Sequence, residues 1–526
     1  MRLSCYLSPT TRPAQNRMTD RAVVVPDRAQ RWMIFAISAT LVARFWLAYV
    51  TPISGDEAYF VLWGRNPDFG FYDHPPMVGW ILSLLLSVGD HPIWLRLPVI
   101  LLPAAISALI YSLLRPTDAV RAAWAASLFT LAPVNALNIF ITTDAPLVLF
   151  TVLSGLSYQR ARLNDRLRDY VLAGIFLGLA FWAKYFSVLL GAAYLVHYLA
   201  GKKTPANSKG LLVLIAAALP FLSLNIYWNM THCWDNLMFN LYNRNEAETF
   251  AWHKPALYGV MLLYLATPAV LLHLWRARAK LPERTPSFTT FVYLLMVPLA
   301  IFLMLSTIKV IGLHWLLSFY PFFFILIALA LHQTALAKCV KFMAWFTAAH
   351  LAAIAAFAAT PVEMWHANPN YDVLVFLFKR DVFYQALAPY EREFHFAADR
   401  YTPASVLSFY FHDRRPVMMF GEGNYHARQD DILTDFRKLN GQNIALILTD
   451  KPELARYQPY FGSIETKTLT VARHTYYMVL GYRFDYRAYR DVVLRTVKEK
   501  YYRIPNYLPV THCYYCERYF PQETCR

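Results

Sequence analysis

Long apolar stretches, each interrupted by a short polar segment, occupy the first two-thirds of the chain. A helix needs about 20 apolar residues to cross a bilayer core of roughly 30 Å, and many of these stretches approach that length. Several are short enough that two of them could instead form half-spans. The pattern predicts about eleven membrane-spanning helices, at about 32–50, 93–114, 120–137, 144–159, 169–183, 185–200, 210–228, 255–275, 289–306, 313–332 and 340–360. The apolar run Met77–Val88 spans only about 12 residues, which predicts an interfacial helix rather than a span.

Apolar and polar residues become mixed after about residue 365. Strand-like segments at Pro416–Phe420, Ile444–Thr449 and Tyr476–Leu480 follow or precede helix-like segments at Ala404–Phe411 and Asp430–Leu439. Alternating strands and helices predict a small α/β domain. The predicted organisation is an N-terminal tail at 1–31, a transmembrane domain at 32–361 with its first outer loop at 51–92, an α/β domain at 365–485 and a basic, aromatic tail at 486–526.

Positive charge is concentrated in every second loop between the predicted spans. Loops rich in lysine and arginine stay on the cytoplasmic side of a membrane. Eleven spans then place the N-terminal tail in the cytoplasm and the segment after residue 361 outside. The arginine- and lysine-rich loops lie at about 12–31, 115–121, 160–168, 202–209, 276–284 and 338–341.

The composition narrows the class of protein further. The chain is 57% hydrophobic and only 16% charged, which excludes an ordinary soluble globular protein of 526 residues. A net charge of +16 could suggest a nucleic-acid partner, but this charge sits in short loops between spans, so no nucleic acid is expected. The partner expected from composition is the lipid bilayer.

Acidic residues stand where the first predicted span ends. Asp56 and Glu57 begin an aromatic, helix-like run, and Asp73 and His74 precede two prolines. A charge at bilayer depth costs roughly 2.5–3.5 kcal/mol, so acids beside a span require a function or a wet cavity. Proline cannot continue a helix, and we therefore expect a rigid bend that points Asp73 and His74 toward the first two acids. The alternative is an ordinary loop with surface carboxylates.

Further polar residues interrupt the apolar sequence, and the predicted orientation places all of them at the outer ends of helices. They are Asp144, Lys184, Asn225, Asn229, Lys309 and His314. Each type also has a structural explanation: an acid can cap a helix, a lysine can extend to the membrane surface, and asparagines can hydrogen-bond between helices.

Together these motifs resemble the GT-C integral-membrane glycosyltransferases, and among them bacterial members of the protein O-mannosyltransferase and aminoarabinose-transferase superfamily. The resemblance covers about residues 30–360. It is carried by Gly55–Tyr59, Tyr72–Pro76, Thr143–Pro146, Ala183–Tyr185 and Asn225–Asn229.

The resemblance implies an all-α polytopic protein of the bacterial inner membrane with a small C-terminal domain in the periplasm. It further implies inverting transfer of a sugar from a polyprenyl-phosphate donor. The acceptor would be lipid A, another glycolipid or a protein on the outer face of the membrane. A transporter or flippase of lipid-linked sugars is the alternative; it would show paired broken helices with charges near mid-membrane and an internal repeat, which we do not find. A non-catalytic scaffold protein is the other alternative, but it would not explain why the acidic residues cluster.

The chemistry of such a transfer suits these residue types. A sugar hydroxyl is a poor nucleophile, so a carboxylate must accept its proton. Asp56 matches the acid of the family's first outer loop and is favoured over Glu57, which is expected to face away as the outer residue of its helix. The leaving lipid phosphate needs cationic or hydrogen-bonding partners, for which Lys184, Lys309 and His314 are candidates.

The predicted site has a catalytic and a substrate-binding part. We expect the catalytic residues to be Asp56, Glu57, Asp73 and His74, and the substrate-binding residues to be Asp144, Lys184, Asn225, Asn229, Lys309 and His314. His74 is expected to orient the acid, and Asp144 to position the acceptor or to bind a divalent cation with Asp56. No cofactor is required, since protein cations can serve a monophosphate-linked donor.

Three of the six cysteines lie near the C-terminal end of the sequence. Cys513, Cys516 and Cys525, together with His512, could bind zinc. Outside the membrane, a disulfide is equally compatible with them.

Overall fold

The computed structural model describes residues 27–243, 249–278, 285–411, 416–421, 427–523 and 525, so most of the predicted N-terminal tail lies outside the described residues. Helices dominate the chain up to Ala359, as the apolar pattern predicts. They are α1 (Arg28–Val50), α2 (Gly55–Arg65), α3 (Met77–Leu86), α4 (Pro92–Leu114), α5 (Ala119–Leu131), α6 (Pro133–Leu137), α7 (Asp144–Asn164), α8 (Leu167–Ala183), α9 (Val188–Ala200), α10 (Pro205–Thr231), α11 (Asp235–Met238), α12 (His253–Ala266), α13 (Pro268–Ala277), α14 (Pro286–Ser306), α15 (Tyr320–Ala330) and α16 (Gln333–Ala359).

Each predicted span contains one of these helices or a broken pair, but not all of them are long. Among the described residues, α1, α4, α10, α14 and α16 are each long and apolar enough to cross a membrane alone. The helices α12 and α13 pass the same test only as a pair bent by 82°. The fold is therefore a polytopic helical bundle, and the number of eleven spans stays a prediction.

The shorter helices have local causes. Proline has no N–H to donate, and Pro133 and Pro268 each begin a new helix directly after a break. Lys184 has an extended backbone, which separates α8 from α9. The predicted span 313–332 is also shorter than expected, because a 3-10 turn at Leu313–Leu316 precedes α15.

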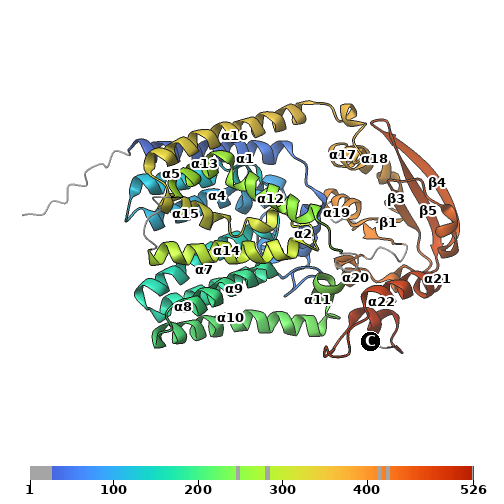
Figure 1. Cartoon of the computed structure of the whole chain (residues 1–526). Coiled ribbons are helices and arrows are strands. Elements are labelled where there is room, and N and C mark those ends of the chain that lie inside the picture. Colours follow the sequence, from blue (N-terminus) through green and yellow to red (C-terminus); the bar gives the residue numbers. More distant parts are fainter. Residues whose placement is uncertain are drawn as a thin grey trace, which may run out of the picture.

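A five-stranded sheet lies beyond one end of the bundle, which we call the sheet end (Figure 1). The strand order is β2-β1-β3-β5-β4; β1 pairs in parallel with β2 and β3, whereas β5 is antiparallel to β3 and β4. The elements of this segment are α17 (Tyr371–Phe378), α18 (Arg380–Leu387), β1 (His395–Ala398), α19 (Tyr401–Tyr410), β2 (Met418–Met419), α20 (Gln429–Leu433), β3 (Ile444–Leu448), β4 (Phe461–Val471), β5 (His474–Phe484), α21 (Tyr486–Tyr489), α22 (Arg495–Tyr501) and α23 (Tyr514–Tyr519).

The predicted strands coincide with β2, β3 and part of β5, whereas β1 and β4 were not predicted. All five residues of β3 are buried, so its continuous apolar run was readable. Most residues of β4 are exposed or half-exposed at the sheet edge, and its polar sequence gave no strand signal. The predicted helix Asp430–Leu439 is interrupted: it forms α20 and then a separate 3-10 turn at Phe436–Leu439.

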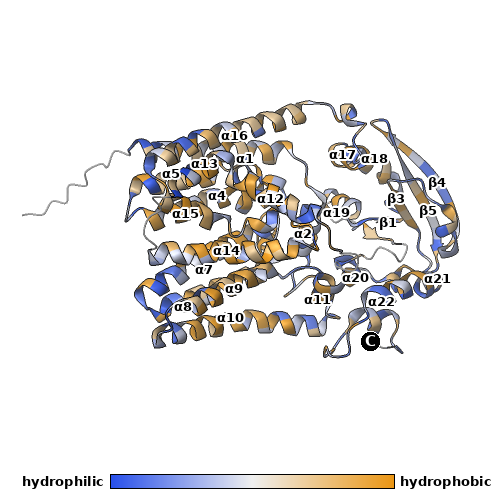
Figure 2. Cartoon of the chain, viewed as in Figure 1, coloured by the Kyte–Doolittle hydropathy of each residue, from blue (hydrophilic) through white to orange (hydrophobic). Residues whose placement is uncertain are grey.

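Hydropathy separates the two parts of the chain (Figure 2). Apolar residues run along the bundle helices, while polar residues gather at the end opposite the sheet and along β4. At the sheet end, α2 packs against α19. A Cβ on Gly55 would lie 2.5 Å from Cγ2 of Thr402, so the close approach of these helices requires glycine there. The Tyr410 hydroxyl accepts a hydrogen bond from the Ile53 N–H at 3.2 Å, which joins the segments further.

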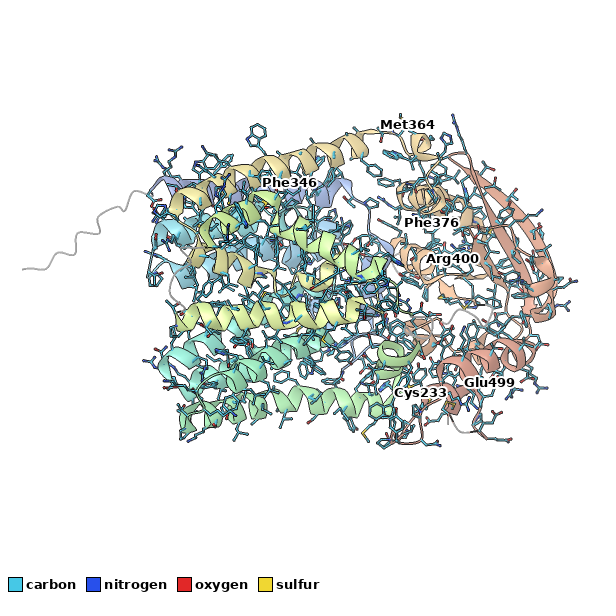
Figure 3. The ribbon with its side chains drawn as sticks, in the orientation of Figure 1. Cys233, Phe346, Met364, Phe376, Arg400 and Glu499 are labelled. Atoms are coloured by element: carbon cyan, nitrogen blue, oxygen red, sulfur yellow. A yellow bond between two sulfur atoms is a disulfide. The ribbon has the colours of Figure 1, made fainter. Side chains whose placement is uncertain are left out.

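Two disulfides fasten the C-terminal tail. Cys233, which follows α10, bonds to Cys513, and Cys516 bonds to Cys525. Figure 3 shows Cys233 at the sheet end of the bundle. Of the two expectations for this tail, the structure shows disulfides, and it adds Cys233, which lies 280 residues away from its partner and had no sequence signal.

Candidate active site

A cavity of about 970 Å³ lies where the sheet end of the bundle meets the C-terminal segment. Its lining combines the start of α2, the loop before α3, the start of α7, the break after α8 and residues from three positions beyond residue 400. Six of the ten predicted site residues line it: Asp56, Asp73, His74, Asp144, Lys184 and His314.

Asp56 reaches the cavity from the first turn of α2. Ser54 caps this helix, since its hydroxyl accepts a hydrogen bond from the Glu57 N–H at 3.3 Å. The Asp56 carboxylate is exposed and accepts a hydrogen bond at 2.9 Å from the hydroxyl of Tyr401 on α19. Burial, and then the charge of Asp56, raise the pKa of Tyr401 to about 12. Tyr401 is thus a permanent donor to this carboxylate at neutral pH.

Glu57 points away from the cavity into protein, and the expectation that it is an outward-facing residue is wrong. Its side chain is 0% exposed. Both carboxylate oxygens bind Arg96, at 2.8 and 2.7 Å, and Oε1 also accepts the Ile141 N–H at 3.1 Å. Arg96 donates its other hydrogen bonds to the carbonyls of Ala48, Thr51 and Pro52. The pair therefore fixes α2 to the end of α1 beside Asp56.

Asp73 and His74 occupy the predicted bend, and Asp73 is almost fully buried. Its carboxylate lies 3.4 Å from the His74 Nδ1, accepts a long hydrogen bond of 3.4 Å from the Tyr59 hydroxyl, and lies 3.5 Å from Nη1 of Arg428. Burial acts to raise the pKa of Asp73, but His74 and Arg428 outweigh it, so that the pKa is lowered. Asp73 is therefore an ionised group at the cavity wall, where it lies beside the permanent cation Arg428.

Lys184 and Asp144 form an ion pair at another wall. The Lys184 Nζ lies 2.8 and 2.9 Å from the two oxygens of Asp144. Asp144 is the first residue of α7, after Thr143 at the cap position. The Lys184 side chain is only 11% exposed, so it binds inside the protein and does not extend to the surface. A break in a helix at this point lets the ammonium group face the cavity.

Three of the predicted substrate-binding residues, Asn225, Asn229 and Lys309, do not line the cavity. Asn225 accepts a hydrogen bond from the Tyr185 hydroxyl at 3.1 Å, and Asn229 accepts one from the Leu237 N–H at 3.2 Å. These contacts tie α10 to its neighbours, as the structural alternative anticipated. Lys309 belongs to the loop after α14 and is not among the residues that line the cavity, whereas His314 is exposed to it.

Sequence reasoning missed two lining residues of the C-terminal segment, Tyr401 and Arg428. Their contacts with Asp56 and Asp73 bridge 345 and 355 residues of sequence. No local motif marks either residue. Only the docking of the C-terminal segment on α2 brings them to the site.

The described residues that line this cavity bring no three metal-ligand atoms close together. Among the described residues, the group of three ligand atoms close enough for one ion is Cys513, Cys516 and Cys525, all of which are in disulfides. Asp56 and Asp144, the expected ligands of a divalent cation, are each bound to a different partner, Tyr401 and Lys184.

A family model and a curated protein that resemble this chain are both described as sugar transferases. Residues 73–228 match a family model described as dolichyl-phosphate-mannose-protein mannosyltransferase. The lipid A galacturonosyltransferase RgtD of Rhizobium johnstonii is 29% identical over 186 residues, which is 34% of this chain and 38% of that protein. The match thus spans well under half the length of this curated relative.

Two solved structures share the fold. The apo form of ArnT from Cupriavidus metallidurans superposes with a TM-score of 0.62 and 16% identity, covering 86% of this chain and 98% of ArnT. The same protein bound to undecaprenyl phosphate gives a TM-score of 0.59 over the same shares of both chains. At this identity the likeness shows the fold alone.

Proposed function

We propose that this chain is a membrane glycosyltransferase of the GT-C type that transfers a sugar from a polyprenyl monophosphate to an acceptor of the cell envelope. The matched family model, the curated relative and the shared fold support this proposal. One observation carries the proposal: a carboxylate, Asp56, faces a cavity of about 970 Å³ whose walls also hold cations. The undecaprenyl phosphate in ArnT, which shares this fold, supports the donor class.

In the proposed reaction the acceptor oxygen attacks the anomeric carbon of the donor sugar. As that bond forms, the bond between the anomeric carbon and the phosphate oxygen breaks, and configuration inverts. The acceptor proton passes to Asp56, and the polyprenyl phosphate leaves with the electron pair. Tyr401 holds the carboxylate in place, because its hydroxyl donates to one oxygen and leaves the other oxygen to accept the proton.

We infer that the acceptor is of the lipid A type. The name of the relative RgtD supports this choice, while another glycolipid or a protein is the alternative. Purified protein, supplied with a polyprenyl-phosphate sugar and lipid A, should release polyprenyl phosphate and add the mass of one sugar to lipid A. A flippase would release no polyprenyl phosphate in this assay. If lipid A stays unmodified while another glycolipid or a protein gains the sugar, that molecule is the acceptor.

The ion pair of Lys184 and Asp144 yields a prediction about the donor. Lys184→Ala should raise the donor KM and lower kcat by about tenfold through loss of a charged partner for the phosphate, while Lys184→Arg should retain part of the activity. The double variant Lys184→Ala/Asp144→Asn is the control, because it removes the unpaired carboxylate as well. If the double variant regains the wild-type donor KM, Lys184 serves only to neutralise Asp144.

The proposed orientation can be tested directly. The charge distribution of the loops supports a periplasmic location of the C-terminal segment. Alkaline phosphatase fused after about residue 365 should be active, since it folds only outside the cytoplasm, whereas the same enzyme fused in the loop between α9 and α10 should be inactive. The reverse pattern would show that the cavity faces the cytoplasm, and the proposed reaction could then not take place in the periplasm.

A further inference from the structure

Arg428 is an arginine of the C-terminal segment whose side chain lines the cavity. It precedes α20 in the C-terminal segment, and its side chain is 26% exposed. The guanidinium carbon lies 4.6 Å from the ring centre of Tyr401 and 5.1 Å from that of Phe239. Two aromatic rings, one from the C-terminal segment and one from the region after α11, therefore hold this cation at the cavity wall.

A second permanent cation lines the same cavity. Among the described residues that line the cavity, Lys184 and Arg428 are the two lysine or arginine side chains. Lys184 contacts both oxygens of Asp144 at 2.8 and 2.9 Å, whereas the contact of Arg428 with Asp73 is 3.5 Å long. Charge-assisted hydrogen bonds are usually 2.7–2.9 Å long, so Arg428 and Asp73 form a long ion pair at the cavity wall.

The backbone conformation of Arg428 indicates that its side chain has a function. Its φ of 55° with ψ of −119° is a conformation that residues with a side chain rarely adopt. Such backbone strain persists where the surrounding structure enforces it, and it often occurs at functional sites. Glycine would relieve the strain, so the presence of arginine here is best explained by its side chain.

We propose that Arg428 is a catalytic residue that binds the phosphate of the polyprenyl-linked donor, so that the C-terminal segment completes the active site. This inference rests on the proposed function. The planar fork of guanidinium donors matches two phosphate oxygens, and it stabilises the charge that grows on the phosphate as the bond to the sugar breaks. Arg428 and Asp56 both contact Tyr401, one at its ring and one at its hydroxyl, which places the phosphate site and the base on opposite parts of one side chain.

The test measures binding of undecaprenyl monophosphate to the full-length protein in nanodiscs, together with thermal unfolding and steady-state kinetics. Arg428→Ala should weaken binding by about tenfold to a hundredfold, and Arg428→Lys should lie between that variant and the wild type, because lysine keeps the charge but not the fork. Arg428→Gly should lose binding equally, yet unfold at a temperature at least as high as Arg428→Ala, since it relieves the strain. Arg437→Ala is the matched control: Arg437 lies in the same segment, is paired with Asp435 at 2.9 Å, and is not among the lining residues.

The outcomes separate the two proposals. If the wild type binds undecaprenyl monophosphate and Arg428→Gly binds it equally well, Arg428 is not the phosphate ligand, while the donor class stands. If the wild type itself binds no polyprenyl phosphate, the donor class is wrong and the assignment of Arg428 falls with it. A parallel loss of binding and of unfolding temperature in both the glycine and the lysine variants would assign Arg428 a purely structural role.

Discussion

Asp56→Asn should lower sugar transfer by about 10²–10⁴-fold, which is roughly 3–5 kcal/mol of activation free energy. Asparagine keeps the volume of the side chain and still accepts the hydrogen bond of Tyr401, but it cannot accept the proton of the acceptor. Folding should change little, because Asp56 is exposed to the cavity at the start of α2. Binding of undecaprenyl phosphate should also survive, since a carboxylate near a phosphate repels it.

The decisive measurement is the rate of polyprenyl-phosphate release by purified protein with its acceptor. Asp90→Asn is the matched control, because Asp90 belongs to the same predicted outer loop, is 43% exposed, and lies 4.0 Å from Arg65 outside the lining of the cavity. Release at the wild-type rate by Asp56→Asn would remove Asp56 from the mechanism. The base would then be sought at Asp73 or Asp144.

Glu57→Gln should lower the free energy of unfolding by about 3–5 kcal/mol, although it alters the residue next to the proposed base and not the base itself. The reason is the buried ion pair: Arg96 and Glu57 are both 0% exposed, and removal of one charge leaves the other uncompensated inside the protein. Total stabilities of domains are about 5–15 kcal/mol, so this loss should appear as a lower unfolding temperature and a lower yield. Activity should fall as well, because the pair anchors the turn that carries Asp56.

A double-mutant cycle tests this assignment. Arg96→Met should destabilise the protein as strongly as Glu57→Gln, and the combination should be less destabilising than the sum of the two, because neither charge then remains unpaired. Unfolding temperatures in detergent provide the measurement. Additive effects, or a wild-type unfolding temperature for Glu57→Gln, would mean that the pair does not anchor α2.

The sequence by itself determined the elements that depend on local patterns. Apolar runs located the bundle helices, because each helix satisfies its own backbone hydrogen bonds and needs only an apolar surface to lie in a membrane. The prolines after His74 and the polar residues Asp144 and Lys184 marked breaks and helix starts, and six of the ten predicted site residues line one cavity. The same local logic located β3, whose residues are all buried, but not the polar edge strand β4.

The tertiary structure alone decided which side chains meet. Glu57 and Asp56 are neighbours in sequence, yet one is sealed against Arg96 and the other faces the cavity, since successive residues of a helix point in different directions and only packing shows what lies there. Tyr401 and Arg428 reach the site across more than 340 residues, and Cys233 finds Cys513 across 280. Such contacts depend on the docking of whole segments, for which a single sequence contains no periodic signal.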